Sequence, residues 1–302
     1  TVAVWDTSDL VTRVKRKAQW TSSAKLTDTE LLAIGDEELQ TFIAPMVRSV
    51  SDGYWVKRYT TAITAAQPLY RIPPRATAGT IYDVSIVDSA GNTRRLLKRS
   101  ASDLYMTRFG WDNNTTSLPI AYVVEADTIR LLPSPSSGLT LLVRYERRPS
   151  QLVATTACQP IATVSTSSLT TTSALSGYSS TYGLDIVQAL PNFDATYDDL
   201  VATQSGSGPY TYTFSQTITN VSVGDYICNP RQTCIVSIPD VLYPILVDRI
   251  AAEALDEVGD SNLAAMIRAQ TERKLPGVLE TLEPRAETSA PAAFNRWSPM
   301  RS

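Results

Sequence analysis

Hydrophobic residues recur at helical spacing near both ends of the 302-residue chain. A first helix is predicted to start at Thr7-Ser8-Asp9 and run through Gln19, and Thr27-Asp28-Thr29-Glu30 is typical of a capping box at the start of a second helix. Pro45 predicts a kink further on. The two longest apolar stripes consist of Leu39, Phe42, Ile43, Met46, Val47 and Val50, and of Leu242, Ile245, Leu246, Ile250, Ala254, Leu255 and Val258.

The second stripe begins after Pro239-Asp240, and Gly259 is placed to end its helix. Pro244 falls in the first turn of that helix, where few amides have helical partners. Asp260-Ser261 starts a further helix, in which Pro276 predicts a bend or a break.

Between these helical regions the hydrophobic period changes to two, which is typical of antiparallel strands with one solvated face. Tyr82, Val84 and Ile86 alternate with polar residues, and a turn follows at residues 89–92. A stretch at 154–183 is dominated by Ser and Thr, and its spaced tyrosines favour short strands over a linker. Further strands are predicted at 139–145, 210–215, 226–228 and 234–238.

These patterns predict an α+β fold in which the two ends of the chain pack into a helical bundle and antiparallel β domains are inserted between them. An extended C-terminal tail completes the predicted fold. The predicted division is a first part of the helical core at 1–62, an antiparallel β domain at 63–153, a Ser/Thr-rich β insertion at 154–238, a second part of the helical core at 239–285 and an extended docking tail at 286–302.

The predicted tail is rich in Ala, Ser and Pro, so it buries too little apolar surface to offset the entropy of ordering it. It nevertheless carries Phe294 and Trp297 beside Arg296 and Arg301, and aromatic residues with Arg are the residues that partner pockets favour. A frayed chain end is the alternative. The pattern predicts a docking arm.

Composition removes several functions. The chain has no His, which excludes Ser-His-Asp and Cys-His catalysis and the usual general base near neutral pH. The formal net charge is −3, whereas a protein that grips nucleic acid needs a surplus of cations. Contact of Arg13, Lys15, Arg16 and Lys17 with DNA is a minority hypothesis beside a solvated helix face. No apolar run approaches the ~18 residues of a membrane span, so we expect no membrane partner.

No motif in the sequence predicts an enzyme or a cofactor. Asn192, Asp194, Thr196 and Asp198 alternate like calcium ligands, but Tyr197 stands where the loop needs Gly and Thr203 where it needs Glu. Asp198-Asp199 are adjacent, so their side chains point apart and do not form an acid/base pair. Gly206-Ser207-Gly208-Pro209 lacks a following helix and a Lys, which favours a hairpin turn over a phosphate loop. Cys158, Cys228 and Cys234 are too few for a disulfide framework or a four-cysteine zinc site, and buried free thiols are favoured over a pair between Cys228 and Cys234.

Several motifs in a fixed order resemble the head-to-tail adaptor (connector, neck) proteins of tailed bacteriophages. Together they touch most of the chain outside the Ser/Thr-rich stretch. They are residues 59–73, which include Gln67-Pro68-Leu69-Tyr70-Arg71-Ile72-Pro73, then 118–122, 129–135, 139–145 and 149–152, followed by 223–227 and 238–240, the helix end at Val258-Gly259-Asp260 and the exit at Pro284-Arg285.

The resemblance implies a structural virion protein that forms a ring, commonly of twelve subunits, seated beneath the portal and continuing the DNA channel towards the tail. It implies that the C-terminal tail docks on the portal, with Arg285, Phe294, Arg296, Trp297 and Arg301 as the portal-binding residues. From the mild acidity of the chain, and not from the resemblance, we expect double-stranded DNA to pass through without specific binding. Tail or nozzle proteins would be further partners. The protein would be made in the host cytoplasm and located in the virion neck. A β-sandwich receptor- or glycan-binding module of a virion, using the Tyr-rich strands for stacking, is the alternative.

Overall fold

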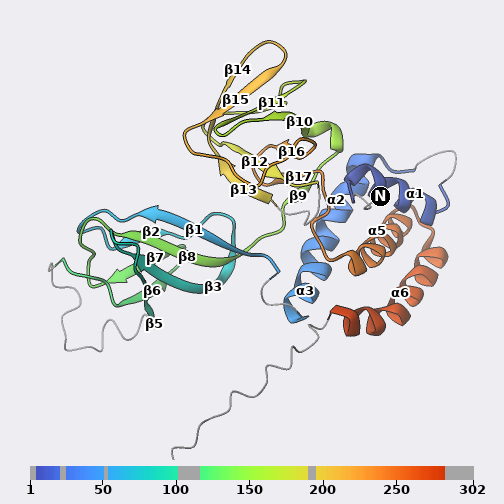
Figure 1. Cartoon of the computed structure of the whole chain (residues 1–302). Helices are drawn as coiled ribbons and strands as arrows, with labels where there is room; N and C mark the ends of the chain where they lie inside the picture. Colours follow the sequence, from blue (N-terminus) through green and yellow to red (C-terminus); the bar gives the residue numbers. More distant parts are fainter. Residues whose placement is uncertain (1–4, 21–24, 51–53, 101–115, 190–194, 283–302) are drawn as a thin grey trace, which may run out of the picture. The chain divides into compact units, whose positions relative to one another are not determined.

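The structure is a computed structural model of the chain, and it describes residues 5–20, 25–50, 54–100, 116–189 and 195–282 (Figure 1). The chain folds into two compact units. One unit combines Thr1–Ser51 with Pro149–Ser302, and the other is Asp52–Arg148. The first unit contains helices and a β region, whereas the second is built from strands.

The helices of the first unit start and stop close to the predicted positions. The Asp6 carboxylate accepts a hydrogen bond from Asp9 N at 2.7 Å and caps α1. The capping box is confirmed, because the Thr27 side chain accepts from Glu30 N while Glu30 accepts from Thr27 N. The helices are α1 (Thr7–Lys17), α2 (Asp28–Glu38), a π-helical turn at Leu39–Ile43, α3 (Ala44–Val50), α5 (Tyr243–Glu257) and α6 (Ser261–Leu282).

The three prolines Pro45, Pro244 and Pro276 affect their helices differently. The π-helical turn lies just before Pro45, where Ala44 N donates to Leu39 O, and both a π-helical turn and a proline are known causes of a kink in a helix. Pro244 lies in the first turn of α5, as predicted. Pro276, in contrast, lies inside α6, which continues to Leu282, so of the predicted bend or break the break is wrong and the bend stays a prediction. Proline removes one amide donor, and helical hydrogen bonding resumes on both sides of it.

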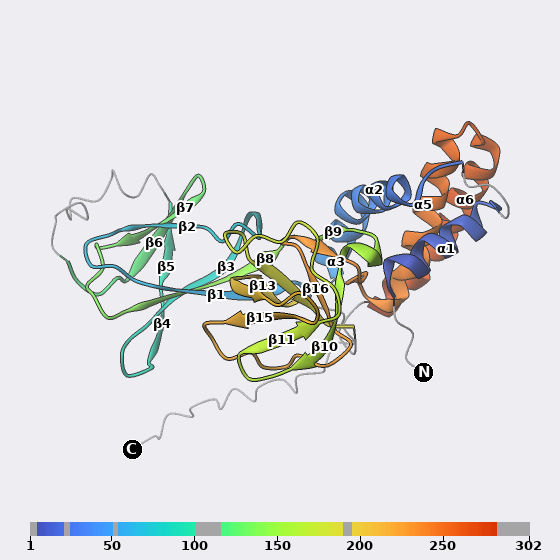
Figure 2. The same ribbon diagram turned by 90° about the horizontal axis from the view of Figure 1, so that it is seen from above.

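α5 lies at the centre of the helical region and packs against α1, α2 and α6 (Figures 1 and 2). It is buried on nearly every side, and Ile250, Ala251 and Ala254 have no exposed surface. α1 contributes Leu10, Val11 and Val14 to this core, the residues predicted to form its apolar face.

The β region of the first unit is one antiparallel sheet of seven strands in the order β13-β12-β16-β10-β11-β15-β14. Strands from both ends of this order share one core, with Ile186 and Ile227 packed in the same cluster as Tyr212 and Phe214, so the sheet curls around it. The strands are β10 (Gln159–Val164), β11 (Ser168–Thr171), β12 (Leu184–Val187), β13 (Ala195–Leu200), β14 (Ala202–Ser205), β15 (Tyr210–Phe214) and β16 (Tyr226–Cys228).

Within this unit, hydrogen bonds between segments that are far apart in the sequence join the helices to the β region. β9 (Gln151–Leu152) pairs in parallel with β17 (Gln232–Thr233), and Thr7 at the start of α1 bonds to both neighbouring segments. Thr7 N donates to Cys234 O at 2.9 Å and Thr7 Oγ1 donates to Val153 O at 2.7 Å. The strand predicted at 234–238 is therefore wrong, because that segment makes only a bridge between Ile235 and Asp6.

The unit Asp52–Arg148 is a nearly closed β-barrel of two four-stranded sheets, β1-β8-β3-β4 and β2-β7-β6-β5. At one seam only Leu96 separates β4 from β5, and Leu96 N donates to Val84 O while Leu97 N donates to Ile120 O. The strands are β1 (Val56–Ala62), β2 (Leu69–Arg71), β3 (Ala76–Val87), β4 (Thr93–Arg95), β5 (Leu97–Arg99), β6 (Ala121–Glu125), β7 (Thr128–Leu132) and β8 (Thr140–Arg147).

The barrel encloses its own core. Val84, Ile86, Leu141 and Val143 point inward from one sheet and meet Ile129, Leu131 and Tyr122 of the other. These inward residues include the alternating positions predicted as strand positions.

The predicted fold class, a helical bundle with inserted β domains, is wrong. The chain is mostly β: strand residues outnumber helical residues in the described part, and the barrel has a core independent of any helix. The helices do not form a self-contained bundle, because α2 packs on β9 and α1 hydrogen-bonds to the segments around it. Helical periodicity locates helices correctly but does not reveal that sheet residues complete their core.

The turn at Gly183 provides a test of the curled sheet. Gly183 has φ +76°, and a Cβ at this position would lie 2.8 Å from the backbone carbonyl of Asp199. Gly224 in the same unit also has a positive φ, +95°, but a Cβ there would meet nothing within 4 Å. Gly183→Ala should therefore lower the free energy of unfolding by about 2 kcal/mol more than Gly224→Ala does. Equal losses in urea denaturation would contradict the close packing of β12 against β13.

Candidate interaction surfaces

The residues predicted to bind a partner through the tail, Arg285, Phe294, Arg296, Trp297 and Arg301, lie outside the described residues. The last described element before them is α6, which ends at Leu282. Among the described residues, the candidate interaction sites are the groups that hold α6 in place and the charged surfaces of the two units.

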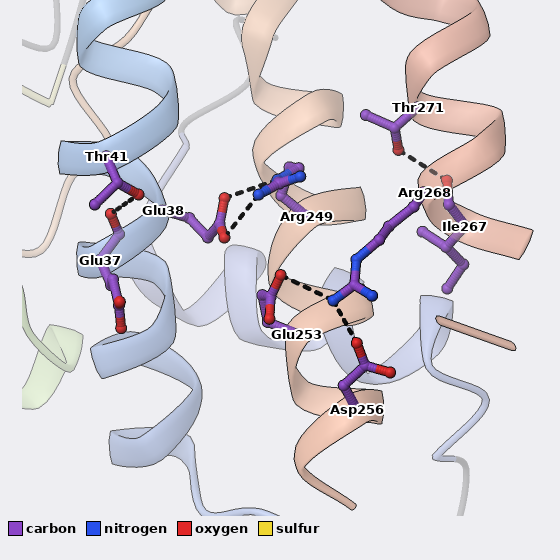
Figure 3. Close-up of polar contacts among 9 residues, drawn as sticks. All are labelled: Glu37, Glu38, Thr41, Arg249, Glu253, Asp256, Ile267, Arg268 and Thr271. Carbon is purple, nitrogen blue, oxygen red and sulfur yellow. Dashed lines mark hydrogen bonds and ion pairs between the residues drawn. The ribbon is translucent and has the colours of Figure 1, made fainter. Parts of the chain in front are cut away.

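A partly buried ion pair joins α2 to α5 (Figure 3). Arg249 Nε donates to Glu38 Oε2 at 2.8 Å and Arg249 Nη2 donates to Glu38 Oε1 at 3.1 Å. The same guanidinium lies 4.4 Å from the ring centroid of Phe42. A two-point Arg–carboxylate contact fixes orientation as well as distance, so α5 is held in one register against the π-helical turn.

Asp248, the neighbour of Arg249, joins three helices. It is 4% exposed, and its two carboxylate oxygens bind Lys17 of α1 at 3.0 Å and Lys274 of α6 at 2.8 Å. A buried carboxylate that lost either cation would keep the desolvation cost without full compensation. α1 and α6 are therefore tied to α5 through one group.

A second contact between α5 and α6 lies near the C-terminal end of α5 (Figure 3). Arg268 Nη2 donates to Glu253 Oε1 at 2.9 Å and also pairs with Asp256. One guanidinium thus serves two carboxylates. Glu257, the last residue of α5, and Asp260, just before α6, are both exposed, and neither forms an ion pair within the described residues.

The start of the chain is held by an aromatic cluster. The Trp5 and Tyr243 rings lie with centroids 4.0 Å apart, and the Arg13 guanidinium lies 4.9 Å from the Trp5 ring. Tyr243 OH donates to Asp9 Oδ2 at 3.1 Å. Burial raises the pKa of Tyr243 well above its ordinary value, and the nearby Asp9 carboxylate raises it further. The hydroxyl therefore stays protonated as a donor.

The basic residues of α1, for which DNA contact is the alternative hypothesis, mostly form ion pairs with carboxylates of the same chain. Arg13 pairs with Asp9, Lys15 with Asp28 and Lys17 with Asp248. Arg16 is exposed and forms no ion pair among the described residues. Paired cations release fewer counterions on binding a phosphate backbone, which weakens the DNA hypothesis for this helix.

The cysteines differ from the prediction of buried free thiols. Cys158 and Cys228 form a disulfide, and Cys234 is the free thiol beside it. The pairing follows from sheet register, since Gln159 opposes Ile227 and Cys158 is therefore opposite Cys228. The three sulfur atoms lie within 4.8 Å of one another and are buried, an arrangement that could hold a soft metal ion only in the reduced chain. Burial raises the pKa of Cys234 to about 12, so it stays a thiol at neutral pH.

The other candidate chemical groups do not gather into a site. Of the four residues that alternate like calcium ligands, Asn192 and Asp194 lie outside the described residues. Thr196 and Asp198 lie along β13. Asp199 N donates to the buried Asp185 carboxylate at 2.9 Å. Asp199 lies where the register between β12 and β13 shifts. The turn predicted at 206–209 is confirmed as the connection between β14 and β15.

The tyrosines of this sheet are mostly used inside it. Tyr212 is fully buried and accepts a hydrogen bond from Leu175 N, and Tyr178 OH donates to Ala202 O. Tyr182, 72% exposed, is an exception among the described residues. Rings held in a core do not provide the stacking surface that the glycan-binding alternative requires.

A basic surface lies on the outer side of the barrel sheet β1-β8-β3-β4, and we name it the basic sheet face. Its residues are Arg58, Arg144, Asp83 and Arg95. Arg58 is directly opposite Arg144, and Arg144 is opposite Asp83. Asp83 Oδ1 lies 2.8 Å from Arg95 Nε. Sequence reasoning missed this face because the three arginines come from three different strands, and only the pairing register brings them together.

We expect the disulfide to contribute to the free energy of unfolding. Cys158→Ala with Cys228→Ala removes a bridge across 70 residues and should lower the free energy of unfolding by about 2–4 kcal/mol beyond the loss of packing. Cys234→Ala is the matched control, since it truncates a buried cysteine of the same cluster and leaves the bridge in place. Denaturant unfolding without reducing agent measures both losses.

Thiol titration checks the assignment in the same samples. The unfolded, unreduced chain should show one reactive thiol and the reduced chain three, and the folded chain should react slowly because Cys234 is buried. Three thiols in the unreduced chain, or equal losses of stability for the two variants, would contradict the bridge.

Comparison with known proteins gives a family. The model of a family described as SU10 adaptor protein matches residues 6–174, from the capping residue of α1 through the barrel to the strands that open the seven-stranded sheet. No curated protein matches the chain. Among the described helices, none has the length and apolar character needed to cross a membrane. The match covers more than half of the chain and confirms the resemblance drawn from its motifs, and the chain therefore belongs to the SU10 adaptor protein family, a family of phage structural adaptors.

Proposed function

We propose that this protein forms a ring between the portal and the tail of a phage particle and continues the channel through which DNA leaves the head. The family match over residues 6–174 carries this proposal, because the family is one of structural adaptors. A structural adaptor works through binding surfaces and needs no catalytic group.

Ion pairs between the helices of the helical region support such a role. Asp248 ties α1 and α6 to α5, and Arg249 ties α5 to α2. Helices held by ion pairs to the buried carboxylates of Glu38 and Asp248 resist sliding past one another, because losing a cation leaves a buried charge uncompensated. A part that transmits force between the head and the tail needs such resistance.

The surface charge supports passage of DNA over retention. The chain carries 27 Lys and Arg against 30 Asp and Glu, a net charge of −3. A mildly acidic protein attracts the phosphate backbone weakly, which suits a channel through which DNA must slide. We place the ring in the virion neck, with twelve subunits, and with tail or nozzle proteins on the side opposite the portal.

Sedimentation and particle images test the ring. The purified chain mixed with portal should sediment as a complex that contains several copies of the chain, and images should show a closed ring on one end of the portal. Portal alone and chain alone are the controls. Only monomeric chain in the presence of portal would contradict the proposed function.

The tail makes a separate prediction. Phe294→Ala with Trp297→Ala should weaken portal binding strongly, since burying each aromatic ring in a partner groove is worth roughly 1.5–3 kcal/mol. Arg301→Ala, the control within the same segment, should weaken it far less. Thermal unfolding of the isolated chain should stay unchanged in both variants.

Truncation after Arg285 checks the same proposal from the other direction. The shortened chain should fold as before and fail to stay attached to the portal. Undiminished attachment would show that the docking residues lie elsewhere in the chain.

A further inference from the structure

We propose that the basic sheet face of one copy docks on the acidic unit of the neighbouring copy, so that opposite charges hold adjacent subunits together. This inference rests on the proposed ring and specifies the contact between its subunits. Its two sides are the barrel residues Arg58, Arg144 and Arg95 and the C-terminal end of α5.

Charge is divided between the two units of the chain. The segment Asp52–Arg148 contains 13 Lys and Arg against 8 Asp and Glu, a formal charge of +5. The remaining residues contain 14 Lys and Arg against 22 Asp and Glu, a formal charge of −8. The net charge of −3 hides this division, and each copy therefore offers one surface of each sign.

The basic sheet face is electrostatically unfavourable in a single copy. Arg58 and Arg144 are both exposed and stand directly opposite each other on neighbouring strands, where like charges destabilise a sheet. Asp83, the nearest carboxylate in register, is already paired with Arg95. Among the described residues neither Arg58 nor Arg144 forms an ion pair, so carboxylates from outside the copy would relieve the repulsion.

The end of α5 is unfavourable in the opposite sense. Glu253, Asp256 and Glu257 lie at the C-terminal end of the helix, where the helix dipole is negative and cations are favoured. Asp260 is the residue before α6 and accepts a hydrogen bond from Leu263 N at 3.5 Å, so it adds a further exposed carboxylate to this surface and also caps α6. No basic residue occupies the last turn of α5. Arg268 from α6 serves both Glu253 and Asp256 (Figure 3), which leaves Glu257 and Asp260 exposed without a cation in the described part of the chain.

A second copy fits both surfaces better than DNA does. In a ring the contacts are head-to-tail, so each copy uses its basic surface once and its acidic surface once. When the ring closes, every basic sheet face is paired with the acidic surface of a neighbouring copy. DNA would satisfy the arginines and leave the larger acidic excess unpaired. It would also be repelled by that excess.

Charge reversal tests the contact on the intact chain with portal present. Arg58→Glu with Arg144→Glu should weaken ring assembly at least tenfold at low salt, and so should Glu257→Lys with Asp260→Lys. The chain that carries all four changes should recover assembly, because the charges are exchanged and the attraction is kept. Arg16→Glu is the control, since it reverses an exposed cation on α1 outside both surfaces. Sedimentation across a salt series measures assembly, and thermal unfolding checks that each variant folds.

The outcomes separate this inference from the proposed function. If the unchanged chain forms no ring on the portal, the proposed function fails. If the unchanged chain forms a ring and either reversed pair assembles equally well, or the fourfold variant stays impaired, this contact is wrong while the ring stands. A short DNA duplex is the last probe: loss of duplex binding in the Arg58 and Arg144 variant, with ring assembly unchanged, would assign the basic sheet face to DNA and overturn the proposal.

Discussion

The burial of α5 is the constraint on which the rest of the first unit depends. Ten of its residues are buried, and Asp248 is among them, with Arg249 beside it. Charged groups in such a position need partners of opposite sign within reach. Lys17, Lys274 and Glu38 supply them from α1, α6 and α2. The placement of the surrounding helices is therefore determined by two adjacent residues of one helix together with its apolar faces.

Local signals in the sequence predict the elements well where a single segment determines them. The capping box at Thr27 and Glu30, the helix that opens at Pro244 and the strand around Val84 all depend on neighbours in the chain. The wrong predictions depend on distant segments. The stretch after Cys234 has strand-like residues, but it turns to meet Trp5 and Thr7, and nothing in its own pattern indicates that partner.

The fold class and the charged surfaces could not be predicted for the same reason. Whether helices form a bundle of their own depends on what covers them, and here Leu152 of β9 packs close to Gly35 of α2. The disulfide requires the register of β10 on β16, and the basic sheet face requires the registers of β8 on β1 and β3. Register is a property of paired strands, so a list of residues along one chain does not contain it. The tail residues predicted to bind the portal stay a prediction.

The boundaries of the family match have a structural consequence. Residues 6–174 include α1 and α2 but stop before α5 and α6. Yet α1 and α2 bury their apolar residues against α5, and Lys17 and Glu38 find their partners only there. The matched segment also contains Cys158 without Cys228, its partner in the disulfide. The matched residues therefore cannot reach this fold as an independent piece, because an isolated α1 and α2 would expose the core that α5 covers. The part of the chain beyond residue 174 belongs to the same compact unit as α1 and α2.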